Sequence, residues 1–179
     1  MSTRSQTSWD VFLGYLAPAP GERILDVGAG NGSKAAQVLR ASGGAEVYAV
    51  DPNEKRVASM KRDFPSIKGS VAGAESLPFP DSHFDKVYST MAVHHFDDLD
   101  KGFAEIVRVL KPGGSFIILE VESNSFSGRL FKFFGRLTGE HMMIMDMDQL
   151  LTRVGKVQGL RISRSVGLGS RYLIQLTRT

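Results

Sequence analysis

Three glycines that follow an apolar run are the first residues in the chain with clear chemical potential. Ile24 to Val27 is apolar apart from Asp26, and Gly28, Gly30 and Gly32 come directly after it. Glycine allows a tight backbone turn and a close approach to a ligand, because it carries no Cβ. Such a turn between a strand and a helix predicts a ligand site, although alone it is also consistent with a plain tight connection.

A second carboxylate, Asp51, ends the next apolar run, which covers residues 47–50. At the tip of the second strand of a nucleotide-binding fold, a carboxylate accepts hydrogen bonds from ribose hydroxyls. The alternative is structural, since an acid before Pro52 is also typical of a helix N-cap. The strand, the glycine turn, the helical pattern after it and this acidic strand end together favour a nucleoside site.

The spacing of the glycines indicates which kind of nucleoside cofactor fits. A dinucleotide loop has the pattern G-x-G-x-x-G, with a pyrophosphate at the helix N-terminus. Here the third glycine comes one residue early, at Gly32, and Ser33 takes the expected glycine or alanine place. The Asp26 carboxylate would repel a pyrophosphate but attract an ammonium group. The pattern favours a cofactor with a cationic amino-acid end over NAD, so an NAD-dependent oxidoreductase is the alternative enzyme.

The elements that must hold these residues alternate regularly along the chain. Most of the strands are apolar runs, which is typical of a parallel sheet covered by helices on both faces. Right-handed crossovers then predict a doubly wound α/β fold. Strands are predicted at 24–27, 45–50, 67–72, 84–90, 115–121, 160–166 and 172–177, and helices at 9–16, 33–40, 57–64 and 99–110.

The last two strands are separated only by residues 167–171. Parallel neighbours need a crossover of about a dozen residues, so this short link is predicted to form a hairpin. The fold expected is therefore a mostly parallel seven-stranded sheet with helices on both faces and an antiparallel C-terminal strand.

The composition indicates one cytoplasmic domain over residues 1–179, with residues 1–20 as an N-terminal helix and linker. The net charge is +3, too small for a nucleic-acid footprint unless the charges cluster. The chain has no cysteine, which excludes disulfides and thiolate chemistry, and no metal site is expected. Residues 1–10 lack a signal-peptide core, and no stretch approaches the ~20 apolar residues of a membrane span.

From residue 23 to residue 120 the chain resembles the class I S-adenosylmethionine-dependent methyltransferases, specifically the small family that includes ubiquinone and menaquinone C-methyltransferases. Five segments carry the resemblance in the same order along the chain, which makes it specific. They are Leu25–Gly32, Val50–Pro52, Ala74–Asp85, Met91–Phe96 and Glu105–Gly114. The resemblance implies the Rossmann-like methyltransferase fold, S-adenosylmethionine as cofactor, and methyl transfer to a small apolar or aromatic molecule.

The resemblance also implies where the cofactor lies. Asp26 and the glycine turn would hold its methionine end, Asp51 its ribose, and Ala74 and Glu75 its adenine, while the end of the fourth strand would meet its amino group. The residues implied are Asp26, Gly28, Ala29, Gly30, Gly32, Asp51, Pro52, Ala74, Glu75, Ser89, Thr90 and Met91.

One position departs from the family pattern. The family commonly has an acid before the Ala-Glu pair, which reaches the adenine amino group, and here Gly73 takes its place. Glu75 is not expected to replace that acid, so adenine binding is predicted to be the weakest part of the cofactor site.

Methyl transfer by in-line displacement mainly requires that the reacting atoms be held collinear and close. A general base is needed only if the acceptor arrives protonated. His94 and His95 are the candidate catalytic bases near the cofactor, and the alternative is that these histidines are structural.

Residues 122–147 are expected to form a lid-like insertion beside the acceptor. Within it, residues 126–137 have the pattern of a basic amphipathic helix, which either covers the substrate pocket or contacts a membrane surface peripherally. The methionines of the 141–145 run, beside His141, either shape an apolar pocket or fill the core. With so small a cap, the pocket is either open to large substrates or completed by a second subunit in a homodimer.

Two further readings belong to other classes of protein. A non-catalytic S-adenosylmethionine-binding module would keep the fold and the cofactor for regulation. A nucleic-acid methyltransferase would carry an Asn/Asp-Pro-Pro-aromatic motif after the fourth strand, where this chain has Ser89 to Ala92. We therefore expect a small-molecule acceptor and no nucleic-acid partner.

Overall fold

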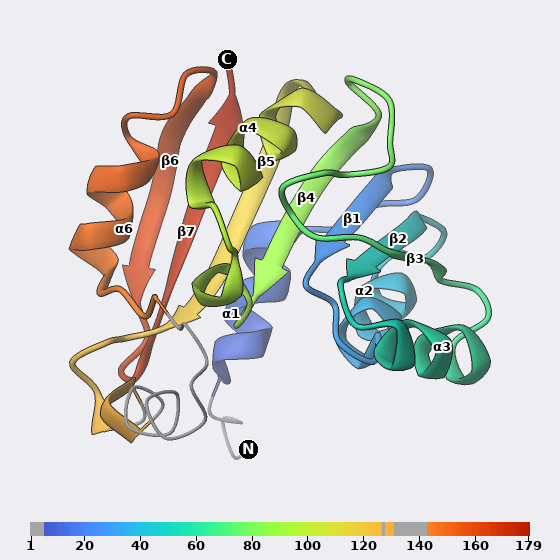
Figure 1. The fold of residues 1–179 in the computed structure, drawn as a ribbon, viewed down its shortest axis with the longest axis horizontal. Coiled ribbons are helices and arrows are strands. Elements are labelled where there is room, and N and C mark those ends of the chain that lie inside the picture. Colours follow the sequence, from blue (N-terminus) through green and yellow to red (C-terminus); the bar gives the residue numbers. More distant parts are fainter. Residues whose placement is uncertain (1–5, 127, 131–142) are drawn as a thin grey trace, which may run out of the picture.

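The computed structural model describes residues 6–126, 128–130 and 143–179 of the chain (Figure 1). Its centre is a seven-stranded sheet in the order β3-β2-β1-β4-β5-β7-β6. The strands are β1 (Arg23–Val27), β2 (Glu46–Asp51), β3 (Lys68–Val71), β4 (Phe84–Thr90), β5 (Leu110–Val121), β6 (Leu160–Gly167) and β7 (Arg171–Arg178).

The strand directions confirm the predicted topology. Strands β1 to β5 pair in parallel, from β3 at one edge to β5. Strand β7 pairs antiparallel with both β5 and β6, so the last strand lies inside the sheet and β6 forms the second edge. The chain order reverses between β1 and β4, and this switch point is where ligands bind in doubly wound sheets.

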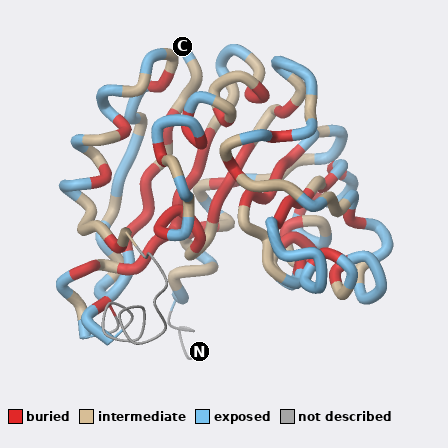
Figure 2. Tube along the Cα trace, viewed as in Figure 1, coloured by how far each residue is buried: buried red, intermediate tan, exposed pale blue. Residues whose placement is uncertain are grey.

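Helices cover both faces of the sheet (Figure 1). The first core cluster packs α4 and α6 on one face, and the second packs α1, α2 and α3 on the other. The helices are α1 (Ser8–Leu16), α2 (Ser33–Ser42), α3 (Glu54–Asp63), α4 (Leu99–Val109) and α6 (Met147–Val154), with the 3-10 turn η1 (Val93–His95). Figure 2 shows that buried residues concentrate along the central strands of the sheet, which form its core.

The start of β5 differs from the prediction. The predicted helix ends at residue 110 and the predicted strand begins at residue 115, which leaves residues 111–114 as a link between them. In the structure β5 already begins at Leu110, which pairs with Phe84, and the register shifts before Ser115 pairs with Lys86. Helix α4 ends at Val109, one residue before the predicted end, and residues 112–114 already belong to β5, where the pairing is irregular.

Two elements are additional to those predicted. Helix α6 begins with a capping box in which Asp146 and Gln149 exchange hydrogen bonds, and η1 follows β4 directly. Most of the helix predicted over 126–137, together with His141 and Met142, lies outside the described residues. Among the described residues, no helix has both the length and the apolar composition that crossing a bilayer requires.

Candidate cofactor site

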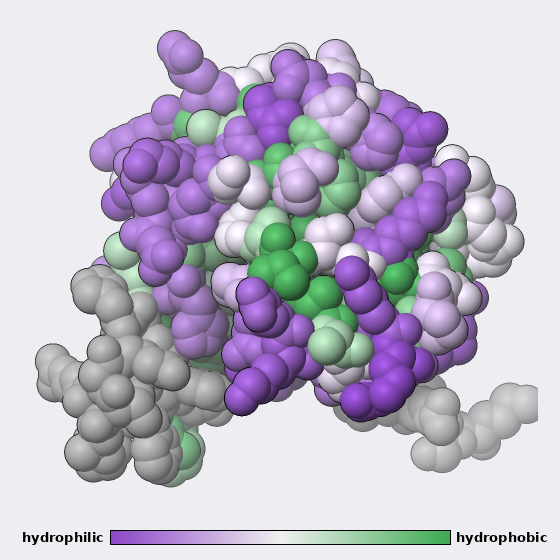
Figure 3. Space-filling model, turned by 45° about the vertical axis from the view of Figure 1, so that its right-hand side comes forward, coloured by the Kyte–Doolittle hydropathy of each residue, from purple (hydrophilic) through white to green (hydrophobic). Residues whose placement is uncertain are grey.

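A cavity of about 630 Å³ opens at the carboxyl ends of β1, β2, β3 and β4. Because these strands are parallel, the segments that follow them emerge at one edge of the sheet and line one space. Apolar residues gather in the middle of this side of the molecule, with hydrophilic residues around them (Figure 3). Nine of the twelve predicted cofactor residues line the cavity: Gly28, Ala29, Gly30, Asp51, Pro52, Ala74, Glu75, Thr90 and Met91.

The glycine turn after β1 fits its place because it lacks side chains. Gly28 has φ +80°, and a Cβ there would lie 2.4 Å from the Ala92 Cβ. The backbone N–H groups of Gly28 and Ala29 both donate to the Val50 carbonyl at 2.9 Å. The turn is thus fixed between β2 and the segment after β4, with its backbone facing the cavity.

Gly32 and Ser89 lie outside the cavity lining and support the turn from behind. A Cβ at Gly32 would lie 2.4 Å from Met60 Cγ of α3, so only glycine allows this close packing. The buried Ser89 hydroxyl donates to the Val27 carbonyl at 2.9 Å. Both residues shape the site without facing the cavity.

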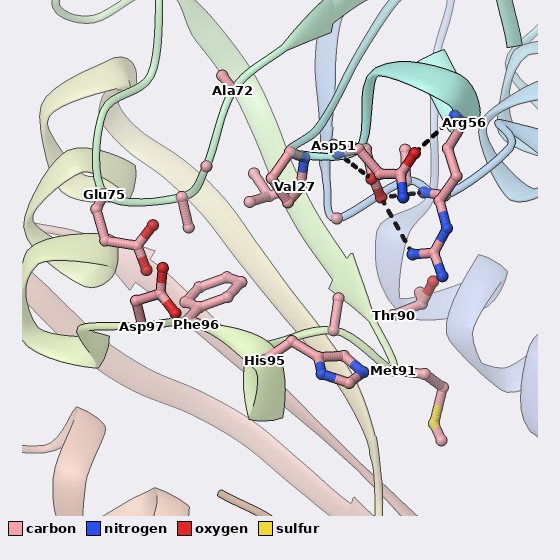
Figure 4. Close-up of a pocket in the computed structure, with 18 of the residues that line it drawn as sticks. Val27, Asp51, Arg56, Ala72, Glu75, Thr90, Met91, His95, Phe96 and Asp97 are labelled. Atoms are coloured by element: carbon pink, nitrogen blue, oxygen red, sulfur yellow. Dashed lines mark hydrogen bonds and ion pairs between the residues drawn. The ribbon is translucent and has the colours of Figure 1, made fainter. Parts of the chain in front are cut away.

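Asp51 organises the part of the cavity next to the turn. Its carboxylate is buried, with Oδ2 accepting from the Gly30 N–H at 2.8 Å and Oδ1 from the Asn53 N–H at 2.9 Å. Arg56 Nη1 lies 3.9 Å from Oδ2 (Figure 4). The N-cap of α3 is Asn53, whose side chain accepts from the Lys55 and Arg56 N–H groups. The structural alternative for Asp51, an N-cap, is therefore wrong.

Asp26 is fully buried directly before the turn, outside the cavity lining. Neither carboxylate oxygen has a hydrogen-bond partner among the described residues. Burial raises the pKa of Asp26 to about 7. The nearby Tyr88 hydroxyl acts against this rise, although its geometry falls short of a hydrogen bond, and the Asp51 charge adds to it. Buried carboxylates without a hydrogen-bond partner are rare, so the position of Asp26 behind the glycine turn needs an explanation.

The far end of the cavity contains an aromatic ring and two carboxylates. Figure 4 shows Glu75 and Asp97 extending toward each other beside the Phe96 ring, across the cavity from Asp51 and Arg56. Glu75 Oε1 accepts from the Asp98 N–H at 3.2 Å, at the start of α4. This end suits a flat ring that carries hydrogen-bond donors.

The structure places the two histidines in different surroundings. His95 is exposed and lines the cavity. His94 is buried outside it, with Nδ1 2.9 Å from Glu120 Oε2 and its ring centroid 4.2 Å from that of His95. Glu120 Oε1 also accepts from the Val93 N–H at 2.8 Å, so this carboxylate holds the first two residues of η1 in place.

Several lining residues were not predicted from the sequence, among them Lys34, Asn53, Arg56, Phe96 and Asp97. Asn53 caps α3 and Arg56 lies in its first turn, shortly after Asp51, and Phe96 and Asp97 follow the histidines. Adjacency in the sequence was therefore the available signal. The Lys34 ammonium lies 4.1 Å from the centre of the Trp9 ring of α1. Burial, and then the charge of Arg171, lower the pKa of Lys34.

Comparison with known proteins places these features in context. The chain matches a family model described as a methyltransferase domain over residues 25–118. It is 36% identical over 127 residues to the ubiquinone/menaquinone biosynthesis C-methyltransferase UbiE of Bordetella parapertussis, covering 67% of this chain and 49% of that protein. The chain thus spans about half the length of the curated relatives it matches.

Solved structures share the fold at low sequence identity. A SAM-dependent methyltransferase from Aquifex aeolicus aligns with a TM-score of 0.80 and 17% identity, covering 97% of this chain and 91% of that one. The geranyl diphosphate C-methyltransferase of Streptomyces coelicolor, solved with Mg²⁺, geranyl diphosphate and S-adenosyl-L-homocysteine, aligns with a TM-score of 0.79 and 16% identity. That alignment covers 96% of this chain and 79% of the Streptomyces chain.

Proposed function

The chain belongs to the methyltransferase domain family, and we propose that it transfers a methyl group from S-adenosylmethionine to a small apolar or aromatic molecule. The observation that carries the proposal is the single cavity that gathers the ends of β1 to β4. Its residues fit this cofactor, because a buried carboxylate that has no hydrogen-bond partner among the described residues lies behind the glycine turn, where a Cβ at Gly28 would clash with Ala92. The spacing of the turn does not favour the dehydrogenase alternative.

We propose a role in cofactor binding for each group of residues from its chemistry and its place around the cavity. Asp51 is suited to accept hydrogen bonds from ribose hydroxyls, and the backbone of Gly28 to Gly30 faces the methionine end. The Asp26 carboxylate contributes negative charge behind that turn, which favours a cationic ligand group. When bound, the cofactor supplies an electrophilic methyl group whose bonding electrons return to sulfur as the acceptor atom forms its bond to carbon.

The residues of the chain contribute mainly by position. Holding two reacting atoms in line accounts for up to ~7–11 kcal/mol of barrier reduction in well-oriented reactions, and it needs no acid or base. Where the acceptor is protonated, we propose His95 as the base, since it lines the cavity. His94 is buried against Glu120 and in our proposal positions its neighbour.

Replacement of each histidine separates these roles. His95→Ala is expected to lower turnover of a protonated acceptor roughly 100-fold or more, with unchanged S-adenosylhomocysteine affinity. His94→Gln should lower turnover less and also lower stability. Equal wild-type turnover in both variants would remove the histidines from the mechanism.

Calorimetric titration with S-adenosylmethionine, S-adenosylhomocysteine and NADH tests the cofactor. Binding of the first two alone supports the proposal, whereas NADH binding alone would overturn it. A screen with methyl-labelled cofactor, beginning with quinone-like compounds, then tests the acceptor. Cofactor binding without transfer to any acceptor would favour the non-catalytic binding module.

We also propose that the chain is a single domain in which residues 122–147 form a lid-like insertion beside the acceptor. We propose that this insertion contacts a membrane surface. Its described part exposes Phe126 by 84% and Leu130 by 44%, with Arg129 exposed between them. This combination suits an anionic bilayer that holds a lipidic acceptor. Co-sedimentation with anionic vesicles should fall in Phe126→Ser and Arg129→Glu. No wild-type binding to such vesicles would remove the membrane role, and sedimentation analysis of the same samples tests the expected homodimer.

A further inference from the structure

Gly73 lines the cavity at the position where the family pattern has an acid, and its backbone does not require glycine. Its φ lies outside the left-handed region in which glycine is favoured. In the part of the chain that the structure describes, a Cβ on Gly73 would meet one heavy atom within 4 Å, Glu75 Oε2 at 2.8 Å. The Glu75 carboxylate therefore occupies the space that a side chain at position 73 would need.

The Glu75 side chain is held in this place by the protein itself. Its Oε1 accepts from the Asp98 N–H at 3.2 Å, which ties the carboxylate to the start of α4. Within the described residues Oε2 makes no hydrogen bond, and it points at Gly73 on the cavity side. One oxygen thus fixes the side chain, and the other remains available as an acceptor.

The residues around Glu75 Oε2 indicate which ligand group this hydrogen-bond acceptor suits. The Phe96 ring lies at the same end, and Asp97 adds a second carboxylate there (Figure 4). The small side chains of Ala72 and Ala74 also line the cavity. The cationic Arg56 lies on the opposite side, beside Asp51. A flat aromatic ring with an exocyclic amine matches a site of apolar surfaces and carboxylate acceptors.

We propose that Glu75 accepts the hydrogen bond of the purine amino group, so that the acid absent at position 73 is supplied from position 75. This inference rests on the proposed function, and it replaces the expectation that adenine binding is weak. Gly73 is then explained by Glu75, because a side chain at 73 would displace the carboxylate. The purine amine needs an acid at one of these two positions, and acids at both positions would compete for the same space.

Reciprocal variants test the pair through S-adenosylhomocysteine affinity measured by calorimetry. Glu75→Ala is expected to weaken binding roughly ten- to 100-fold, as for the loss of a hydrogen bond to a charged group. Gly73→Asp alone should also weaken binding, since its carboxylate meets that of Glu75 at close range. The double variant Gly73→Asp/Glu75→Ala should recover most of the loss. Additive losses in the double variant would overturn the inference.

A change of the purine substituent gives a second readout. S-inosylhomocysteine carries a carbonyl where S-adenosylhomocysteine carries the amine, so wild type should prefer the amine. Glu75→Gln keeps an acceptor for the Asp98 N–H but can also donate to the carbonyl, so the preference should shrink roughly tenfold. Unfolding of the unliganded variants checks that the fold is intact.

The outcomes separate this inference from the function on which it rests. Wild-type binding of neither compound would overturn the proposed function and the inference with it. Wild-type binding of S-adenosylhomocysteine, with an unchanged preference in Glu75→Gln, would overturn the inference alone. A preference lost in Asp97→Asn and kept in Glu75→Gln would assign the purine amine to the other carboxylate and overturn it as well.

Discussion

Two buried carboxylates lie toward the same edge of the sheet in opposite situations. Asp26 near the end of β1 is 0% exposed, and Glu120 near the end of β5 is 3% exposed. Glu120 accepts hydrogen bonds from the Val93 N–H and pairs with His94 Nδ1, whereas Asp26 has no partner among the described residues. Both residues are acidic and buried, so they differ in their hydrogen-bond partners. Glu120 therefore has a structural role that the described contacts explain, whereas those contacts leave Asp26 unexplained.

The largest expected effect concerns the pH dependence of folding. The pKa of Asp26 is 3.8 unfolded and about 7 folded, so between these values the folded state binds the extra proton. Stability must therefore fall as pH rises from about 4 to about 8, by about 4 kcal/mol for a shift of about three units. Urea unfolding of the unliganded proteins should show this fall of stability with pH in wild type but not in Asp26→Asn. Parallel pH profiles would mean that Asp26 finds a partner in solution, and the contrast with Glu120 would fail.

Removal of Glu120 should affect folding rather than ligand binding. Glu120→Ala leaves His94 and the Val93 N–H without their buried partner, and it is expected to cost about 3 kcal/mol of unfolding free energy. Glu120→Gln retains an acceptor for Val93 and should lose less. Thermal and urea unfolding measure both variants. A wild-type unfolding free energy in Glu120→Ala would show that η1 does not depend on this carboxylate.

The smallest expected effect sharpens the ligand side of the contrast. Asp26→Asn removes the charge behind the glycine turn and should weaken S-adenosylhomocysteine binding roughly tenfold, about 1.4 kcal/mol, at pH 8. Asp148→Asn, which changes an exposed acid of α6, serves as the matched control. Equal affinities in wild type and Asp26→Asn would reduce Asp26 to a tolerated buried acid.

The half of the site near β1 and β2 was predictable because local sequence fixes it. A tight turn needs glycine where φ is positive, and Asp51 follows an apolar strand at a fixed place in the fold. The predicted parallel strands and the antiparallel C-terminal strand follow from the same logic, since short links and long crossovers permit few topologies.

The half near η1 was not predictable, because the deciding contacts are distant in sequence. His94 and His95 are neighbours, yet a 3-10 turn places one against Glu120 and the other in the cavity. The relation between Gly73 and Glu75 likewise depends on a side-chain conformation that Asp98 fixes from 23 residues away. The start of β5 was misplaced because Pro-Gly-Gly is compatible both with a helix end and with an irregular strand.

The placement of β7 inside the sheet has a consequence for synthesis on the ribosome. Strands β1 to β5 emerge in an order that lets each new strand pair with one already made, and β6 emerges next. Strand β7 pairs with both β5 and β6, so neither of these pairings can form until residues 171–178 leave the exit tunnel. During that interval the apolar β5 has an unpaired edge, which is a hazard for aggregation. Chaperone demand should therefore peak between the emergence of β5 and that of β7, and fall when β7 inserts.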